Sequence, residues 1–208
     1  MTTTYPLTFP SVGVRSSSFR LRNVVSESQS VYTGATQVYA HQGQWWEGEI
    51  TFVKTNRETA SELVAFLLAL RGKFGTFLYG DPDYLALGSR GAGGGTPLVA
   101  GGSQTGRTLD VDGFTPLTTV YYKGDYFSLG SGTSTRLYCL TKDATTDSSG
   151  AVTLDFEPAL RSSPDDDDPL TFTGAKCLMM LNENVAEWNV NESNIYDFSI
   201  PIRERLNI

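Results

Sequence analysis

The sequence predicts a mainly β protein that carries one amphipathic helix. Short stretches in which apolar and polar side chains alternate recur along most of the chain, as half-buried strands require. Glycine, serine and threonine are abundant, and the hydrophobic fraction of 39% is low for a compact enzyme. This composition is typical of antiparallel β structure with many turns. A chain of 208 residues can hold one large domain or two small ones, and we expect two.

The clearest pattern is a strand followed by a helix. Residues 45–53 alternate as a strand does, with Trp46, Ile50 and Phe52 on one face. Thr55 and Glu58 then have the spacing of a capping box, which predicts a helix over Asn56–Arg71, about 24 Å long. Gly72 follows as the residue able to adopt the left-handed conformation that ends a helix. The apolar stripe of this predicted helix consists of Ala60, Leu63, Val64, Leu67 and Leu70.

Extended structure and a turn follow the helix. Phe74, Phe77 and Tyr79 indicate a strand, and residues 80–83 predict a tight turn because Pro82 fixes its own φ and restricts the residue before it. Gly88–Gly95 is rich in glycine, which has the largest backbone freedom, so we expect a flexible domain junction there.

From residue 96 onward, short strand patterns recur between turn residues. Such a series is typical of a small antiparallel β-barrel. Residues 195–202 alternate again near the C-terminus, and we expect this strand to return and pair near Trp46–Phe52. Pro201 cannot donate to a ladder, so the strand is expected at an edge or with an unused outward amide. The predicted strands of the barrel are Thr108–Val111, Val120–Leu129, Thr135–Ala144, Ala151–Phe156 and Leu170–Thr173.

The expected organisation is therefore discontinuous. Residues 1–90 and 178–208 form the first domain with the helix, and residues 96–177 form the second barrel, inserted before the C-terminal strand.

Four segments resemble proteins of long-tailed bacteriophages. Leu70–Phe77 (LRGKFGTF) and Asp81–Tyr84 (DPDY) follow an amphipathic helix as they do in distal and minor tail proteins, the tail-tip hub family. Phe9–Val14 (FPSVGV) is similar to the start of the same proteins. Lys123–Leu160 is similar to a barrel module of phage structural proteins.

The resemblance implies a fold and a structural function. The first domain would be a split β-barrel hub with one helix, and copies of the chain would form a hexameric ring coaxial with the tail tube. The ring would join the tube protein to tip or fibre proteins in the virion tail, after synthesis in the host cytoplasm, and would perform no enzymatic step. The expected interface residues are Arg15, Arg20, Arg22, Trp45 and Trp46.

Trp45 and Trp46 are adjacent in a strand and so point to opposite faces. Both are therefore not expected to be buried in one monomer, and one of them is expected to meet a neighbouring subunit.

Charge and hydropathy narrow the range of partners. The formal net charge is −7, which argues against nucleic acid as a direct partner beyond the tube lumen. Arg15, Arg20 and Arg22 alone read more simply as a solvated face. No apolar stretch is long enough to cross a bilayer, and the N-terminal residues lack the pattern of a signal peptide, so no membrane contact is expected. Cys139 and Cys177 are isolated from each other and are expected to be apolar core thiols.

The sequence shows no converging set of reactive side chains, so we expect no catalytic residue, metal site or cofactor. His41 is the only histidine and falls in a turn-like run, which favours a polar surface residue. Asp165–Asp168 lacks the alternating spacing of a calcium loop and is expected to be a solvated loop. Asp81 and Asp83 suit turn capping better than hydrolysis. Gly91–Gly95 has neither the lysine nor the helix of a phosphate loop.

Two rival functions remain open from the sequence. A carbohydrate-binding β module that contacts host surface glycans would use Trp45 and Trp46 with the aromatic residues Tyr121, Tyr122 and Tyr126. A small hydrolase would depend on Asp81 and Asp83, and it lacks a base, a nucleophile and an oxyanion site.

Overall fold

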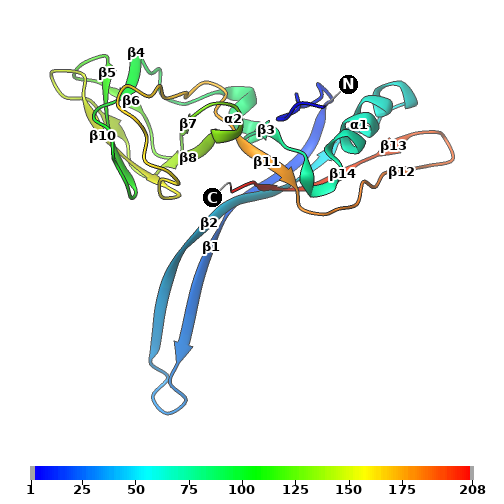
Figure 1. Ribbon diagram of the computed structural model, residues 1–208, viewed down its shortest axis with the longest axis horizontal. Coiled ribbons are helices and arrows are strands. Elements are labelled where there is room, and N and C mark those ends of the chain that lie inside the picture. Colours follow the sequence, from blue (N-terminus) through cyan, green and yellow to red (C-terminus); the bar gives the residue numbers. More distant parts are fainter. Residues whose placement is uncertain (1–2, 207–208) are drawn as a thin grey trace.

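The computed structural model describes residues 3–206 and is mainly β, with 43% strand and 13% helix. The predicted fold class is thereby confirmed at this level. The expected first domain extends to residue 208, of which residues 207–208 lie outside the described part. Figure 1 shows a long hairpin that projects away from a body containing two curled sheets.

The first sheet is antiparallel and combines strands from both ends of the chain. The C-terminal strand pairs with residues 47–51, as the alternation pattern predicted, so that Ile200 lies opposite Ile50. It lies in the middle of the sheet, so of the two alternatives offered for Pro201 the edge strand is wrong and the unused amide position remains. The order is β1 (Val14–Gln29), β2 (Thr36–Phe52), β14 (Ser199–Glu204), β11 (Cys177–Leu181) and β3 (Phe77–Tyr79).

Helix α1 (Arg57–Leu70) confirms the predicted helix and packs its apolar stripe into the first core. Its cap differs from the prediction. The Asn56 side chain accepts a hydrogen bond from the Thr59 amide at 3.2 Å, whereas Thr55 exchanges backbone hydrogen bonds with Tyr196. Thr55 is thus already part of a β-bridge, and the following residue caps the helix. At the other end Arg71 adopts the left-handed conformation before Gly72 does.

The predicted tight turn at residues 80–83 opens a second helix, α2 (Pro82–Leu87). Pro82 occupies the first helical position, where a missing amide proton costs nothing. Asp81 caps the helix by accepting from the Asp83 amide at 3.0 Å, so its expected capping role is confirmed although the turn is helical. Phe74, expected in a strand, lies in the short 3-10 helix η1 (Gly72–Phe74) and is exposed.

The second sheet contains all or part of four of the five strands predicted after residue 95, and one strand, β4, that was missed. Val120–Leu129 is broken into two strands at a turn around Gly124, and residues 170–173 form isolated bridges only. Residues 169–171 bond to β4 on one side and to β7 on the other, which gives the sheet a barrel-like outline. The order is β4 (Gly95–Val99), β5 (Thr108–Phe114), β10 (Val152–Glu157), β8 (Arg136–Leu140) and β7 (Tyr126–Leu129), with β6 (Thr119–Tyr121) pairing β9 (Ala144–Thr145) nearby.

Strands β7 and β8 lie between two apolar cores. Leu137 and Tyr126 pack against the first core, which α1 covers. Phe127, Tyr138 and Leu140 point the other way, into the core of the second sheet. Burial on both faces holds the two sheets together, since a shared pair of strands cannot leave either core without exposing it.

The glycine-rich segment that was expected to be a flexible junction is held in place. Asp125 is buried, and its carboxylate accepts hydrogen bonds from the amides of Arg90 and Gly91 at 2.9 and 3.2 Å. A Cβ atom on Gly91 would lie 2.1 Å from the Val120 carbonyl oxygen, so only glycine fits there. The segment then continues into strand β4. This run therefore serves close packing rather than flexibility.

Strands β12 (Asn189–Val190) and β13 (Tyr196–Asp197) form a short separate pair before β14. The predicted strand over residues 195–202 is thus divided into β13 and β14. The 3-10 helix η2 (Gly132–Ser134) connects β7 to β8.

Candidate functional site

The most distinctive surface is the outer part of the β1–β2 hairpin, residues 22–42, which we call the arm. All of these residues are exposed. Strand β14 pairs with β2 only at residues 47–51, so among residues 3–206 the arm has two strands and neither of its edges is paired. Eight residues of β1 in the arm extend about 26 Å at the usual rise per residue, and Figure 1 shows this hairpin pointing away from the body.

Apolar side chains lie on both faces of the arm. Val25 pairs with Ala40 and Glu27 with Val38, which places Val25 and Val38 on one face. Tyr39 belongs to the other face and is 68% exposed. At the tip, Tyr32 is 98% exposed. An isolated two-stranded hairpin is at best marginally stable in water, so such a surface is typical of a segment that is covered by another molecule.

The arm also lacks the charges that usually protect exposed strand edges. Within residues 22–42 the only charged side chains are Arg22 and Glu27. Soluble proteins commonly prevent unwanted pairing at a free edge with lysine, proline or a bulge. One irregularity in register occurs near the base of the arm, between Asn23 and Val25. The rest of the arm is a regular ladder open to pairing.

His41 lies within the arm, in a strand, so the expectation that it falls in a turn-like run is wrong. It belongs to strand β2, where its Nε2 atom lies 2.8 Å from the Ser26 hydroxyl. Its ring meets that of Tyr39 edge-on at 5.1 Å. The described residues place no carboxylate in contact with this histidine, so the Ser26–His41 pair lacks the third member of a triad.

The base of the arm is anchored by Gln44, a buried residue that the sequence analysis did not single out. Its Nε2 donates to Asn23 at 2.6 Å and to Glu157 at 3.0 Å, and its Oε1 accepts from the Ala159 amide at 3.2 Å. The Arg161 guanidinium donates to its backbone carbonyl. These contacts fasten the start of the arm to the second sheet, so the arm projects from a fixed point.

The two adjacent tryptophans have different environments. Trp46 is buried, donates from Nε1 to the Leu137 carbonyl at 2.9 Å and stacks on Phe19. Its side chain is enclosed within this chain, which leaves no surface for a partner. Trp45 points to the opposite face, is partly exposed and donates to Glu47 at 3.2 Å. Of the expected pair, Trp45 is therefore the one available for an intermolecular contact.

The three expected arginines are all exposed, on two different surfaces. Arg20 and Arg22 flank Glu47, with nitrogen to oxygen distances of 2.8 and 3.7 Å. Burial raises the pKa of Glu47, but hydrogen bonds from Arg20 and Trp45 and the charges of both arginines bring it below its ordinary value. Arg15 lies elsewhere, in an open groove of about 830 Å³ between the start of β1 and helix α2.

The other expected residues show no chemical site. Cys177 is buried and Cys139 half-buried, both as free thiols. Burial raises the pKa of Cys139 to about 11, with Asp125 and Asp81 adding to the effect. Of the aromatic residues suggested as a sugar platform, Tyr121 stacks on Phe172 in the core and Tyr126 is half-buried between the sheets. Tyr122 is 39% exposed and lies under the Arg90 guanidinium.

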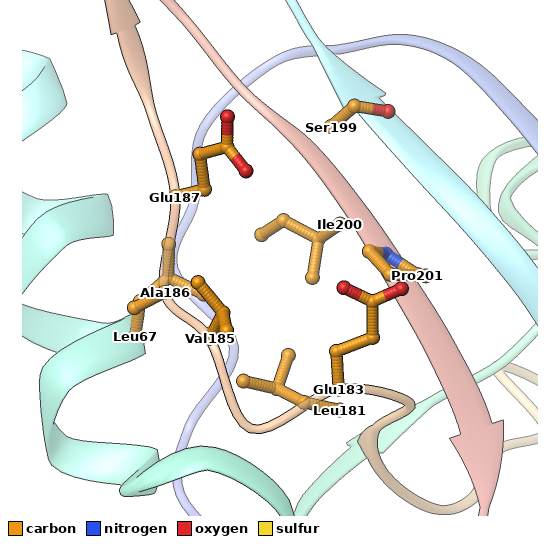
Figure 2. A pocket seen from close by; sticks show the side chains of 9 residues that line it. All are labelled: Leu67, Leu181, Glu183, Val185, Ala186, Glu187, Ser199, Ile200 and Pro201. Carbon is orange, nitrogen blue, oxygen red and sulfur yellow. The ribbon is translucent and has the colours of Figure 1, made fainter.

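A small pocket between α1, β14 and residues 183–187 carries two carboxylates. Figure 2 shows Glu183 and Glu187 beside an apolar lining to which Leu67 and Ile200 contribute. Its volume of about 60 Å³ is far below the roughly 300 Å³ or more of pockets that enclose organic ligands. Among residues 3–206 no three histidine, cysteine, aspartate or glutamate side chains group as metal ligands. Neither helix of that part of the chain is long and apolar enough to span a bilayer.

Comparison with known proteins gives no family assignment: no protein-family model matches the chain, and no curated protein does either.

Proposed function

We propose that this chain is a structural subunit of the tail tip of a long-tailed bacteriophage. Copies would assemble into a closed hexameric ring, coaxial with the tail tube, that joins the tube protein to tip or fibre proteins. On this proposal the first sheet with α1 is the split-barrel hub, and the protein acts by assembly alone. The motifs at Leu70–Phe77 and Asp81–Tyr84 support the family, and the arm supports the assembly.

The arm is the observation that carries the proposal. A two-stranded ribbon with exposed Val25, Val38 and Tyr39 gains stability when another surface covers it, because each buried apolar side chain contributes about 1.5–3 kcal/mol. A neighbouring copy of the same chain supplies such a surface at every position of a closed ring.

The free edge of β1 supports the same conclusion. Strand β1 ends the first sheet and is paired on one side only, along sixteen residues. A long free edge favours aggregation unless an assembly covers it. Cyclic closure covers the same edge in every copy, and the open groove near Arg15 and α2 offers further surface for a neighbour.

The proposal is tested by weakening the arm without disturbing the body. Val25→Thr, Val38→Thr and Tyr39→Thr together keep residues that favour strands while removing the apolar surface. Sedimentation velocity over a concentration series is expected to show that wild-type copies self-associate. Negative-stain images of the associated species are expected to show rings. The triple variant is expected to raise the dissociation constant at least tenfold, about 1.4 kcal/mol per interface.

Val190→Thr is the matched control, since Val190 is a 48% exposed strand valine outside the arm. It is expected to assemble like the wild type. In purified tail particles, quantitative mass spectrometry is expected to find the chain in the stoichiometry of one ring per tail. A triple variant that assembles as well as the control, or tail particles that lack the chain, would overturn the proposal.

A further inference from the structure

A basic face surrounds Trp45 on the outer side of the first sheet. Cross-strand pairing aligns Arg20, Glu47 and Arg203 in one row on three adjacent strands, because Glu47 is opposite Arg20 on one side and Arg203 on the other. In the next row Arg22 lies opposite Trp45. We define the basic face as Arg20, Arg22, Lys73, Arg203 and Arg205.

The basic face has too few acidic partners of its own. Glu47 already pairs with Arg20 and Arg22. Among residues 3–206, Lys73, Arg203 and Arg205 have no carboxylate within ion-pair distance. The Arg203 Nε atom is buried and has no hydrogen-bond partner in that part of the chain.

Three of these cations line one hollow. Lys73, Arg203 and Arg205 border a depression of about 470 Å³, and Trp45 and Met180 add an apolar lining. Glu204 also belongs to this lining, but its side chain is buried and its carboxylate pairs with Arg161. Guanidinium groups recognise carboxylates through pairs of parallel hydrogen bonds. The hollow therefore suits a short acidic segment whose carboxylates reach the cations while its backbone packs on Trp45.

A segment of this kind is present on another part of the chain. Asp165, Asp166 and Asp167 are exposed, and no residue within 3–206 forms an ion pair with any of them. The turn is solvent-exposed, as the sequence suggested, and backbone hydrogen bonds hold its shape. The Asp167 amide donates to the Val99 carbonyl at 3.0 Å, and the Asp166 carboxylate accepts from the Gly101 amide at 2.7 Å. We call residues 165–168 the acidic turn.

The acidic turn and the basic face belong to different ends of the molecule. The turn is bonded to β4 of the second sheet, whereas the basic face consists of residues on β1 and β14, at the end of β14 and on η1, beside the first sheet (Figure 1). Among residues 3–206 no ion pair joins the acidic turn to the basic face of the same chain. Between two copies, a contact joining two different surfaces is head-to-tail, which is the kind that closes a ring.

We propose that the basic face binds the acidic turn of a second copy of this chain. The inference rests on the proposed ring and identifies one of its contacts. A nucleic acid would offer a competing source of negative charge, but a chain of net charge −7 repels a polyanion at long range. A short acidic turn carried by the same protein instead brings three exposed carboxylates on a small surface.

Charge reversal on each side tests the contact. Lys73→Glu with Arg203→Glu reverses the basic face, and Asp165→Lys with Asp167→Lys reverses the acidic turn at side chains that accept none of the hydrogen bonds holding it. Each double substitution alone is expected to weaken self-association, measured by sedimentation, at least tenfold at about 0.1 M salt. The effect is expected to be smaller at about 1 M salt, where screening is strong. All four changes in one chain are expected to restore association to within about threefold of wild type, because both charges are then exchanged.

Lys123→Glu with Asp112→Lys is the matched control, since both residues are exposed and their side chains pair with no charge among the described residues. It is expected to behave as the wild type. Three outcomes would overturn the contact. They are charge reversals on one side that have no effect, a variant with all four substitutions that stays dissociated, and a wild-type chain that is monomeric up to about millimolar concentration. Binding of a short DNA duplex, lost on Lys73→Glu with Arg203→Glu, would assign the face to a polyanion instead. Rings that persist when the charges are reversed would contradict this contact but not the proposed ring. The arm variants test the ring itself.

Discussion

Arg161 and Glu204 form an ion pair that links the two sheets where no solvent reaches the carboxylate. The Arg161 Nη2 atom lies 2.8 Å from Glu204 Oε2, and the Glu204 side chain is 0% exposed. The same oxygen accepts a hydrogen bond from the Trp46 amide at 3.0 Å. Glu204 belongs to β14 of the first sheet, and Arg161 follows β10 of the second. One carboxylate therefore fixes the base of the arm, the C-terminal strand and the second sheet relative to one another.

Arg161→Ala is expected to lower the free energy of unfolding by about 3–5 kcal/mol, because it leaves a buried carboxylate without its cation. Urea denaturation measures the change. Arg161→Met with Glu204→Leu is expected to cost less than Arg161→Ala alone, since no uncompensated charge stays buried. Arg107→Ala is the control: its pair with Glu157 has a similar distance, 2.7 Å, but its side chains are 53% and 34% exposed, and its loss is expected to cost under about 1 kcal/mol. An equal effect of Arg107→Ala and Arg161→Ala would contradict this account.

The pH dependence of stability follows from the same carboxyl. Burial raises the pKa of Glu204 above its ordinary value, although Arg161 and the Trp46 amide oppose the shift. The folded state then holds the proton more tightly than the unfolded state, so the contribution of this group is complete below the unfolded pKa and is lost as pH rises through the folded pKa. As pH increases from about 4, the unfolding free energy of the wild type is therefore expected to fall relative to that of Glu204→Gln. A difference that shifts toward the wild type over this window would show that the pKa is lowered.

Substitutions of the two adjacent tryptophans are expected to have different effects, one on the stability of the fold and the other on self-association. Trp46→Ala removes a buried ring and its hydrogen bond to Leu137, and is expected to cost about 3–5 kcal/mol. Trp45→Ala removes a partly exposed ring and is expected to cost under about 1 kcal/mol, while it weakens self-association. Thermal melting and sedimentation of the two variants provide the comparison. A destabilised Trp45→Ala that associates normally would place Trp45 in a purely internal role.

Much of the fold follows from local patterns. The helix was predictable because its apolar residues recur at three- and four-residue steps, and the C-terminal strand because its apolar and polar residues alternate. Asp81 was predictable as a cap because proline follows it. In each case the signal lies within a few residues of the element that it specifies.

The arm and the polar links between the sheets were not predictable, for physical reasons. The arm is exposed on both faces, so it lacks the one-sided burial that makes a strand visible in a sequence. Gln44, Asp125 and Glu204 are polar residues whose partners are distant in sequence, and a polar side chain carries no local mark of being buried. Asn56 replaced Thr55 as the helix cap because Tyr196, far along the chain, pairs with Thr55.

The position of β14 makes the first sheet dependent on the end of the chain. This strand lies between β2 and β11, and its residues Ile200 and Ile202 are buried in the first core. A chain that ends at Asn194 would lose the hydrogen bonds on both sides of β14 and the Glu204 carboxylate, leaving β2 and β11 unpaired with each other. Truncation is therefore expected to abolish cooperative unfolding of the N-terminal half, seen as loss of near-UV circular dichroism and rapid exchange of the β2 amides at residues 47–51. Deletion of residues 24–41, which removes a comparable length from the exposed arm, is the control and is expected to keep the melting of the body. A truncated chain with native circular dichroism and unchanged melting would mean that β2 and β11 hold the core without their central strand.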